Sequence, residues 1–367
     1  MALAFAGTAP FGADILRGLL DGAGDHAGRE VALVISQPDR PAGRGRKVSS
    51  SAVTQLARQR GLRLEQPERT HSDEMLALYA ELDIDTIIVA AFGQMIREPL
   101  LSDYLLLNVH GSLLPAYRGA APVERVIMDG HDETGVDIMQ MEAGLDTGPV
   151  AYVGRVPITV EDDAGSIFTK IADVGTELLH RALDDAAAGT LTFTPQDEAG
   201  ATYAHKIVAA DRYLNFAVSS RALHDRVRAL SPHIGAFTMV GDERLGLWRT
   251  ALIDGASVAG SAMAASPSGA RAAAEPAAMS APDELAVTVW QQPGVVAHTA
   301  KRLVIGTVDG AVEVLELQPA GKRRMAASDW LRGLREPLAS AVTPPPTETV
   351  SPAAPSTPGT PTDVAGH

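Results

Sequence analysis

The sequence predicts a two-domain protein, in which an α/β domain with a mostly parallel sheet and covering helices precedes a smaller β-barrel. Three observations predict this arrangement. Through about residue 190, short apolar segments alternate with longer segments of helical periodicity, which is the pattern of βα units. Beyond residue 236 the apolar segments are short and separated by turn residues, as in small barrels. A chain of 367 residues with 46% hydrophobic residues is also long enough to bury two cores.

The first βα unit opens the chain, with a strand at Leu3–Ala6, a turn at Gly7-Thr8 and a helix at Phe11–Leu20. A second buried strand is predicted at Val31–Ile35, where apolar residues run together. The pair resembles the start of a Rossmann-like, dinucleotide-type fold. However, the turn is GTAPFG and lacks the G-x-G-x-x-G spacing, which argues against a nicotinamide cofactor.

A cationic segment, QPDRPAGRGRK at residues 37–47, follows the second strand. Its prolines and glycines predict a loop without regular structure. Its cations repel one another unless a polyanion binds, and arginine can pair bidentately with phosphate. A flexible solvated loop is the alternative. The sequence favours phosphate contact by four residues: Arg40, Arg44, Arg46 and Lys47.

Two helices and another buried strand come next. The helices are predicted at Ser51–Arg60 and Ser72–Glu81, and the strand at Thr86–Ala91. This strand ends at Phe92-Gly93, where the glycine allows the chain to turn.

The stretch LLLNVHGSLLPAYR carries the first candidate functional residues. An apolar run at Leu105–Leu107 predicts a buried strand, and Asn108 and His110 follow it two residues apart. Positions i and i+2 share one face of a strand, and Gly111 and Pro115 then begin a loop. Open α/β sheets build their sites at such strand ends. On this spacing alone, a catalytic role and capping of local backbone groups are equally supported.

A carboxylate in a glycine-rich turn is the second candidate. After a predicted helix at 121–129 and a strand at Val136–Met141, Asp146 lies between Gly144 and Gly148. Alone, an Asp in such a position is usually a turn former. If His110 lies nearby, the carboxylate can instead orient the imidazole. The domain then closes with a strand and a long amphipathic helix, at Ala151–Pro157 and Ala164–Ala187.

The second domain begins with a helix at Ser220–Leu230. Short strands follow at Phe237–Val240, Leu245–Arg249, Gly294–Ala297, Leu303–Thr307 and Val312–Leu317. An Ala/Ser/Pro-rich segment at about 255–293 contains too few bulky apolar residues to fold, and we expect a disordered insertion there. The expected division is 1–203, 204–337 and a disordered proline-rich tail at 338–367.

Composition excludes several classes of protein. The chain has no cysteine, so disulfides and cysteine-based metal sites are excluded. No apolar run of about 18 residues predicts a membrane span. The N-terminus lacks a basic region and is broken by Gly7 and Pro10, so we expect a strand there rather than a signal peptide, and a cytoplasmic location. Residues 1–200 carry 16 Lys/Arg and 30 Asp/Glu, and residues 201–367 carry 15 of each. The net charge of −14 therefore comes from the first 200 residues.

Five motifs in order, FAGT, QPDRPAGRGRK, NVHGSLLPAYRGAAP, MQMEAGLDTG and LQPAGKRRM, are closely similar to those of methionyl-tRNA formyltransferases. The resemblance runs from about residue 3 to 337, interrupted by the insertion. It implies formyl transfer from 10-formyltetrahydrofolate to the α-amine of methionyl-initiator tRNA. We also expect a monomer and no metal. It also implies that the C-terminal barrel is OB-fold-like and contacts tRNA.

The resemblance assigns roles residue by residue. The catalytic positions are Asn108, His110 and Asp146. The folate-contacting positions are Ser112, Leu113, Leu114 and Pro115, with Phe92 and Gly93 beside the pterin. The tRNA-contacting positions are Arg40, Arg44, Arg46, Lys47, Lys206, Lys322 and Arg323, and further basic candidates are Arg226, Arg228, Lys301, Arg302 and Arg324. Two alternatives remain: a formyltransferase acting on a sugar-nucleotide or glycinamide ribonucleotide amine, and a non-catalytic RNA-binding protein.

Overall fold

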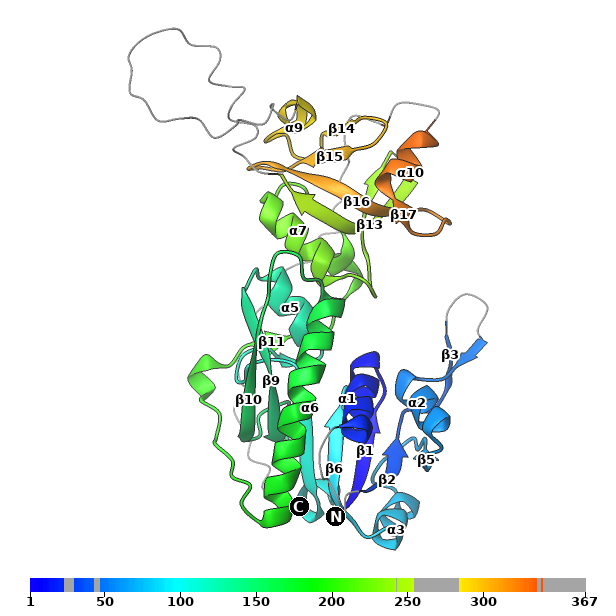
Figure 1. Ribbon diagram of the computed structural model, residues 1–367, viewed down its shortest axis with the longest axis vertical. Helices are drawn as coiled ribbons and strands as arrows, with labels where there is room; N and C mark the ends of the chain where they lie inside the picture. Colours follow the sequence, from blue (N-terminus) through cyan, green and yellow to red (C-terminus); the bar gives the residue numbers. More distant parts are fainter. Residues whose placement is uncertain (23–29, 43–46, 242, 254–283, 335–337, 339–367) are drawn as a thin grey trace, which may run out of the picture.

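The computed structural model describes residues 1–22, 30–42, 47–241, 243–253, 284–334 and 338. Two parts lie one above the other along the long axis of the molecule (Figure 1). The lower part holds the N-terminal sheet and its helices, and the upper part holds the C-terminal sheet. The predicted fold class, an α/β domain followed by a smaller β domain, is confirmed.

A seven-stranded sheet organises the first part, in the order β10-β9-β7-β6-β1-β2-β5. Pairing from β7 to β5 is parallel, whereas β9 runs antiparallel to both β7 and β10. A nine-residue connection between β9 and β10 is too short for the crossover that a parallel pair needs. The strands are β1 (Ala2–Gly7), β2 (Glu30–Ile35), β5 (Leu64–Glu65), β6 (Ile84–Ala90), β7 (Leu105–His110), β9 (Glu133–Gln140) and β10 (Val150–Pro157).

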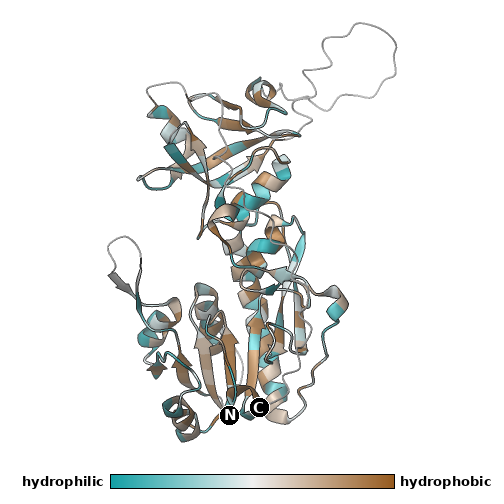
Figure 2. Cartoon of the chain, turned by 180° about the vertical axis from the view of Figure 1, so that it is seen from behind, coloured by the Kyte–Doolittle hydropathy of each residue, from teal (hydrophilic) through white to brown (hydrophobic). Residues whose placement is uncertain are grey.

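Helices cover both faces of this sheet, and its strands are mostly apolar (Figure 2). On one face α1 and the long α6 pack against β7 and β9, burying Leu107, Val109 and Ile138. On the other face α3 and α4 bury Tyr79 and Leu100. The helices are α1 (Pro10–Asp21), α2 (Ala52–Arg60), α3 (Asp73–Glu81), α4 (Leu100–Asp103), α5 (Pro122–Met128) and α6 (Ala164–Ala188).

The cationic segment contains regular structure, so the prediction of an irregular loop was wrong. Strands β3 (Arg40–Ala42) and β4 (Lys47–Ser49) form an antiparallel hairpin, and the tip at 43–46 lies outside the described residues. Proline cannot donate to a strand ladder, but a two-stranded ribbon leaves outward positions where no donor is needed.

A two-stranded parallel sheet ties the end of the first domain back to its centre. Strand β11 (Tyr203–Ala204) pairs with β8 (Arg118–Gly119), which follows the loop after β7. Two short 3₁₀ helices flank β11, at Glu198–Gly200 and Ala209–Arg212. The chain beyond residue 190 therefore lies against the candidate site.

The second part is an antiparallel, curled, barrel-like sheet in the order β12-β13-β16-β15-β14, with β17 on β16. Helices α7 and α10 pack against it and bury Leu223, Val227 and Leu331. The elements are α7 (Ser220–Ala229), β12 (Ala236–Val240), β13 (Glu243–Leu252), α9 (Glu284–Val289), β14 (Val296–His298), β15 (Leu303–Gly306), β16 (Ala311–Pro319), β17 (Met325–Ala326) and α10 (Ala327–Arg332).

Helix α9 lies within the segment predicted as a disordered insertion, so the prediction was wrong for residues 284–293. Val289 is buried against Val304 and Ala311, and Leu285 packs on the same cluster one turn earlier. This i, i+4 pair gives α9 an apolar face that packs on the second domain. Residues 254–283 and the tail at 339–367 lie outside the described residues.

Helix α7 joins the two parts through buried polar groups. Arg228, 5% exposed, donates to the carbonyls of Thr159 and Asp162 at 2.9 and 2.8 Å. His224 donates from Nε2 to the carbonyl of Val160 at 3.1 Å, and burial lowers the pKa of this imidazole. These contacts fix the second domain on the loop between β10 and α6. Among the described residues, no helix is long and apolar enough to cross a membrane.

Candidate active site

Asn108 and His110 lie on one face at the end of β7. Leu107 and Val109 point to the opposite face, into the core beneath α6, so the alternation of the strand directs the two polar side chains together. Asn108 is 8% exposed and His110 6% exposed. Within the described residues, the Asn108 amide makes no hydrogen bond. An unpartnered amide N–H that is nearly buried is available to a bound molecule.

His110 lies between a carbonyl and a carboxylate. Its Nε2 is 3.2 Å from the carbonyl oxygen of Tyr117, which can only accept, so Nε2 carries hydrogen. Its Nδ1 is 3.7 Å from Oδ2 of Asp146. This second distance is longer than a hydrogen bond but within the range of an ion pair. The structure therefore brings the three predicted catalytic residues to one place, with the carboxylate beside the imidazole.

The turn that carries Asp146 has a special backbone. Asp146 has φ +52°, a left-handed conformation that Asp tolerates better than most residues. Its Oδ2 accepts the N–H of Gly119 at 2.8 Å. A Cβ at position 148 would lie 1.8 Å from the carbonyl oxygen of Gln140, so only glycine fits there. The glycines of the EAGLDTG motif thus aim the carboxylate inward, towards His110.

Three residues without a predicted role hold this turn. Gln196 donates from Nε2 to the carbonyls of Asp146 and Gly148, at 2.8 and 2.7 Å. Its Oε1 accepts from Arg118, at 2.7 Å from Nη2, and Arg118 is 1% exposed and also pairs with Glu198. Arg118 stands inside the NVHGSLLPAYRGAAP motif. No local sequence signal marks Gln196 or Glu198, which lie near this turn because the chain returns to the first domain and pairs β11 with β8.

The loop after β7 is held at several points. Ser112 donates from Oγ to the carbonyl of Ala116 at 2.7 Å, and Leu113 packs so closely on Gly135 that a Cβ there would lie 2.2 Å from it. The N–H of Leu114 donates to Oδ2 of Asp137 at 2.8 Å. Asp137 is fully buried, and burial raises the pKa of its carboxyl to about 7.

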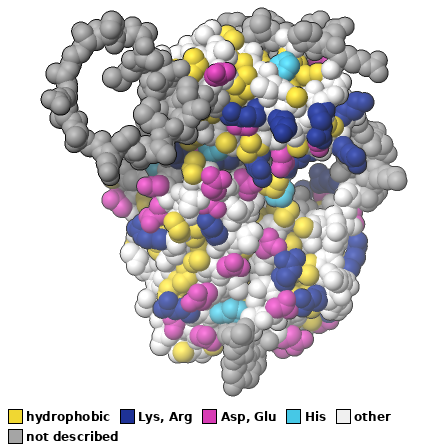
Figure 3. Space-filling view, turned by 45° about the horizontal axis from the view of Figure 1, so that its top comes forward, with side chains coloured by type: hydrophobic (Ala, Val, Ile, Leu, Met, Phe, Trp, Pro, Cys, Tyr) yellow, Lys and Arg dark blue, Asp and Glu magenta, His cyan; other side chains and the backbone are white. Residues whose placement is uncertain are grey.

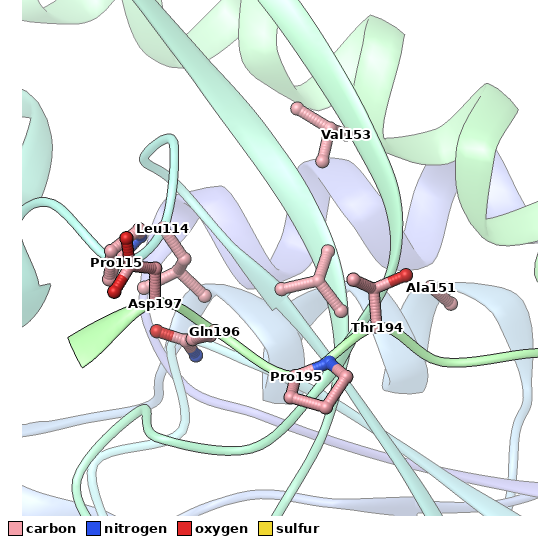
Figure 4. Close-up of a pocket in the computed structure, with 9 residues that line it drawn as sticks. Leu114, Pro115, Ala151, Val153, Thr194, Pro195, Gln196 and Asp197 are labelled. Carbon is pink, nitrogen blue, oxygen red and sulfur yellow. The ribbon is translucent and has the colours of Figure 1, made fainter. Parts of the chain in front are cut away.

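A pocket of about 290 Å³ opens between this loop and the edge strand β10. Leu114 and Pro115 form one side, and the segment that carries Gln196 forms another (Figure 4). The remaining lining residues are Val150, Ala151, Val153, Thr194, Pro195 and Asp197. Two of the predicted folate-contacting residues therefore line a pocket, while Ser112, Leu113, Phe92 and Gly93 do not line it.

Phe92 and Gly93 lie at the end of β6, on the same edge of the sheet as Asn108. The Phe92 side chain is 3% exposed and packs in the core, so it does not form an open wall. Its carbonyl accepts from Thr8 Oγ1 at 2.7 Å and from Gln37 Nε2 at 3.1 Å. This strand end therefore contributes backbone and fixed polar groups, and Gly93, with φ +75°, turns the chain away.

The predicted tRNA-contacting cations have different environments. Arg40 is exposed and pairs with Glu68 at 3.3 Å. Lys206, Lys322 and Arg323 are also exposed. Arg44 and Arg46 lie outside the described residues, and Lys47 is described only as backbone of β4. Figure 3 shows Lys and Arg side chains gathered in a band across the upper part of the molecule.

Some of the further basic candidates have structural partners. Arg228 is buried at the domain junction, where it pairs with Asp225 at 2.6 Å, so its assignment to a binding surface was wrong. Arg302 pairs with Glu313 at 2.6 Å. Arg324 pairs with Glu316 and stacks on a tryptophan ring. Among the described residues, no group of three or more His, Asp or Glu could hold a metal ion.

The residues at the end of β7 suit acyl transfer. An unpartnered amide donor, an imidazole and a carboxylate are the groups needed to stabilise an oxyanion and move a proton. Leu114 and Pro115, in the loop that follows His110, line the pocket beside β10, whereas Asn108, His110 and Asp146 do not line it. This donor set fits a co-substrate that carries a transferable acyl group.

Comparison with known proteins agrees with this chemistry. Residues 1–183 match the family described as formyl transferase, and residues 206–335 match the formyl transferase C-terminal domain. A methionyl-tRNA formyltransferase of Alcanivorax borkumensis is 38% identical over 348 residues, covering 93% of this chain and 95% of the other.

Two solved structures are similar in fold. The N-formyltransferase from Helicobacter canadensis, in complex with folinic acid and dTDP-3-aminofucose, is 15% identical with a TM-score of 0.55, covering 85% of this chain and 98% of the other. HypX from Aquifex aeolicus, in complex with tetrahydrofolic acid, is 15% identical with a TM-score of 0.55. The match covers 90% of this chain, which spans about half the length of HypX (46%).

Proposed function

This chain belongs to the methionyl-tRNA formyltransferase family and transfers a formyl group to methionyl-initiator tRNA, and we propose that Asn108, His110 and Asp146 carry out the transfer. We further propose 10-formyltetrahydrofolate as the donor. The observation that carries the proposal is the Asn108 amide, nearly buried and without a hydrogen-bond partner among the described residues, beside the His110–Asp146 pair.

The bound donor supplies a formyl group on a nitrogen that can leave as an amine. The α-amine of methionine attacks the formyl carbon, a C–N bond forms, and the formyl oxygen gains negative charge. The Asn108 N–H donates to this oxygen. A prepositioned donor of this kind contributes roughly 3–4 kcal/mol.

The attacking amine must lose a proton, and the leaving nitrogen must gain one. Asp146 takes up the amine proton, because its carboxylate lies beside His110 on this face. Asp146 then passes this proton to Nδ1 of His110, 3.7 Å from its Oδ2. His110 delivers a proton to the leaving nitrogen as the bond between that nitrogen and the formyl carbon breaks, and both side chains return to their starting protonation states. The proton balance therefore closes within two side chains.

We propose that residues 1–203 form the catalytic domain and residues 204–337 the tRNA-binding domain. Arg40, Arg44, Arg46 and Lys47 would contact the acceptor stem from the β3–β4 hairpin, while Lys206, Lys322 and Arg323 would contact it from the second domain. Arg40, Lys206, Lys322 and Arg323 are exposed cations, and residues 206–335 match the family's C-terminal domain, which supports this assignment. A cytoplasmic, monomeric enzyme fits this substrate.

The first experiment measures formyl transfer from 10-formyltetrahydrofolate to methionyl-initiator tRNA, with amino-sugar nucleotides and glycinamide ribonucleotide as competing acceptors. We expect transfer to tRNA alone. Preferential transfer to a nucleotide amine would establish the alternative formyltransferase activity instead.

The second experiment separates the catalytic roles. Asp146→Asn should abolish proton uptake and slow transfer, whereas Asp132→Asn, at an exposed carboxylate, should not. If Asp146→Asn transferred at the wild-type rate while Asn108→Ala was inactive, the role proposed for Asp146 would be wrong.

The third experiment tests the hairpin. Arg44→Ala and Arg46→Ala should weaken tRNA binding, retain folate binding, and lower the salt slope by about one charge each. An unchanged salt slope in both variants would exclude contact between the hairpin tip and the phosphates.

A further inference from the structure

Asp137 is a buried acid that the proposed chemistry does not use. It lies in the middle of β9 with none of its surface exposed. Its Oδ2 accepts the N–H of Leu114 at 2.8 Å, while its Oδ1 has no hydrogen-bond partner. Buried carboxylates normally have both oxygens satisfied, because an unpaired buried charge is costly.

The position of Asp137 links it to the active site. It is the register partner of His110 across the antiparallel pair β7–β9. Directly opposed residues point to the same face, with Cβ atoms about 5 Å apart. Its neighbours Val136 and Ile138 point to the other face, into the core beneath α6. Asp137 therefore lies on the catalytic face, under the loop that follows His110.

Few charged groups surround it. His110 faces it from β7, and Arg155 on β10 acts on it through space but is largely exposed and paired with Glu133. The loop contributes the Leu114 N–H. Burial, opposed by that N–H and by Arg155, raises the pKa of the carboxyl to about 7. Its charge therefore changes near neutral pH.

We propose that Asp137 is a positioning residue for the folate co-substrate: its carboxylate holds the Ser112–Pro115 loop through the Leu114 N–H, and proton uptake loosens the loop. An N–H bond to a carboxylate is roughly twice as strong as one to a neutral oxygen. A proton on the free Oδ1 leaves Oδ2 as a weaker, neutral acceptor. This inference depends on the proposed function, in which the loop contacts folate.

The test is calorimetric titration of the full chain with folinic acid from pH 6 to 8.5. No tRNA is present, so no formyl group is transferred during the titration. Wild-type affinity should fall by about three- to tenfold between pH 8 and pH 6. Asp137→Asn keeps an acceptor oxygen but cannot take up a proton, so its affinity should vary less than about twofold over the same range. Asp132→Asn, an exposed carboxylate just before β9, should follow the wild type.

Wild type and Asp137→Asn differ at this one side chain, so the difference between their pH profiles belongs to Asp137. Asp137→Leu, which removes the acceptor, should bind weakly at every pH. Equal pH profiles in wild type and Asp137→Asn, or tight binding by Asp137→Leu at pH 8, would overturn the inference and leave the proposed function intact. Absence of folinic acid binding by the wild type at every pH would overturn both.

Discussion

Replacing Asp137 by Asn should change how the stability of the protein depends on pH. Burial raises the pKa of this carboxyl from 3.8 to about 7, against the opposing effects of the Leu114 N–H and Arg155. Between these two values the native state keeps a proton that the unfolded chain has released. The free energy of unfolding therefore decreases as pH rises from about 4 to about 7, and the loss is complete above pH 7.

The shift sets the size of the effect. About three pKa units, at about 1.4 kcal/mol per unit, correspond to ~4 kcal/mol over the full range. About 3 kcal/mol of this falls between pH 5 and pH 8. The amide of the Asp137→Asn variant cannot ionise, so relative to wild type the variant should gain this amount over that interval. For a domain of about 200 residues the corresponding gain in thermal midpoint is about 6–12 °C.

Scanning calorimetry of the full chain at several pH values measures this difference directly. Asp132→Asn is the matched control, because its carboxylate is exposed and its midpoint should follow the wild type at every pH. The reasoning is refuted if the midpoint difference between Asp137→Asn and wild type stays within about 2 °C from pH 5 to pH 8, less than about 1 kcal/mol.

Three further changes test other parts of the structure. Asn108→Ala removes the amide donor and should lower kcat about 10²–10³-fold in a single-turnover transfer assay, with folinic acid binding retained; an unchanged kcat would exclude the oxyanion role. Gln196→Glu replaces the donor that clamps the Asp146 turn by an acceptor and should lower kcat about a hundredfold while the KM for folate stays constant. A raised KM with an unchanged kcat would assign Gln196 to binding. Arg228→Ala leaves its acidic partner buried and should cost about 3–5 kcal/mol in denaturant unfolding, whereas Arg332→Ala, at an exposed pair, should cost about 0–1 kcal/mol.

Much of the N-terminal domain was predictable because local pattern and burial agree there. The apolar runs at β1, β2 and β6 became strands within a residue or two of their predicted ends, and the run at Leu105–Leu107 extends through Asn108 to His110 in β7. Ser51 and Ser72 cap the two helices predicted to begin with them. The i, i+2 spacing of Asn108 and His110 on one strand face was enough to expect the two side chains to point the same way.

Local sequence pattern failed to predict two elements, the β3–β4 hairpin and α9. Prolines and glycines argued against a strand here, but the short two-stranded ladder of β3 and β4 needs few backbone donors. The Ala-rich sequence before α9 argued against a helix there. The apolar face of α9 stabilises the helix only when it packs on β15 and β16.

The sequence by itself determined the two domains, the end of β7 as a candidate site and, through five motifs, the resemblance to formyltransferases. Tertiary structure alone decided what surrounds the proposed catalytic residues. Gln196 clamps a turn about 50 residues away in the chain, and Asp137 supports a loop 23 residues before it. Periodicity reports only on near neighbours, whereas these contacts arise because the antiparallel β9 and the return at β11 bring distant segments onto one face of the sheet.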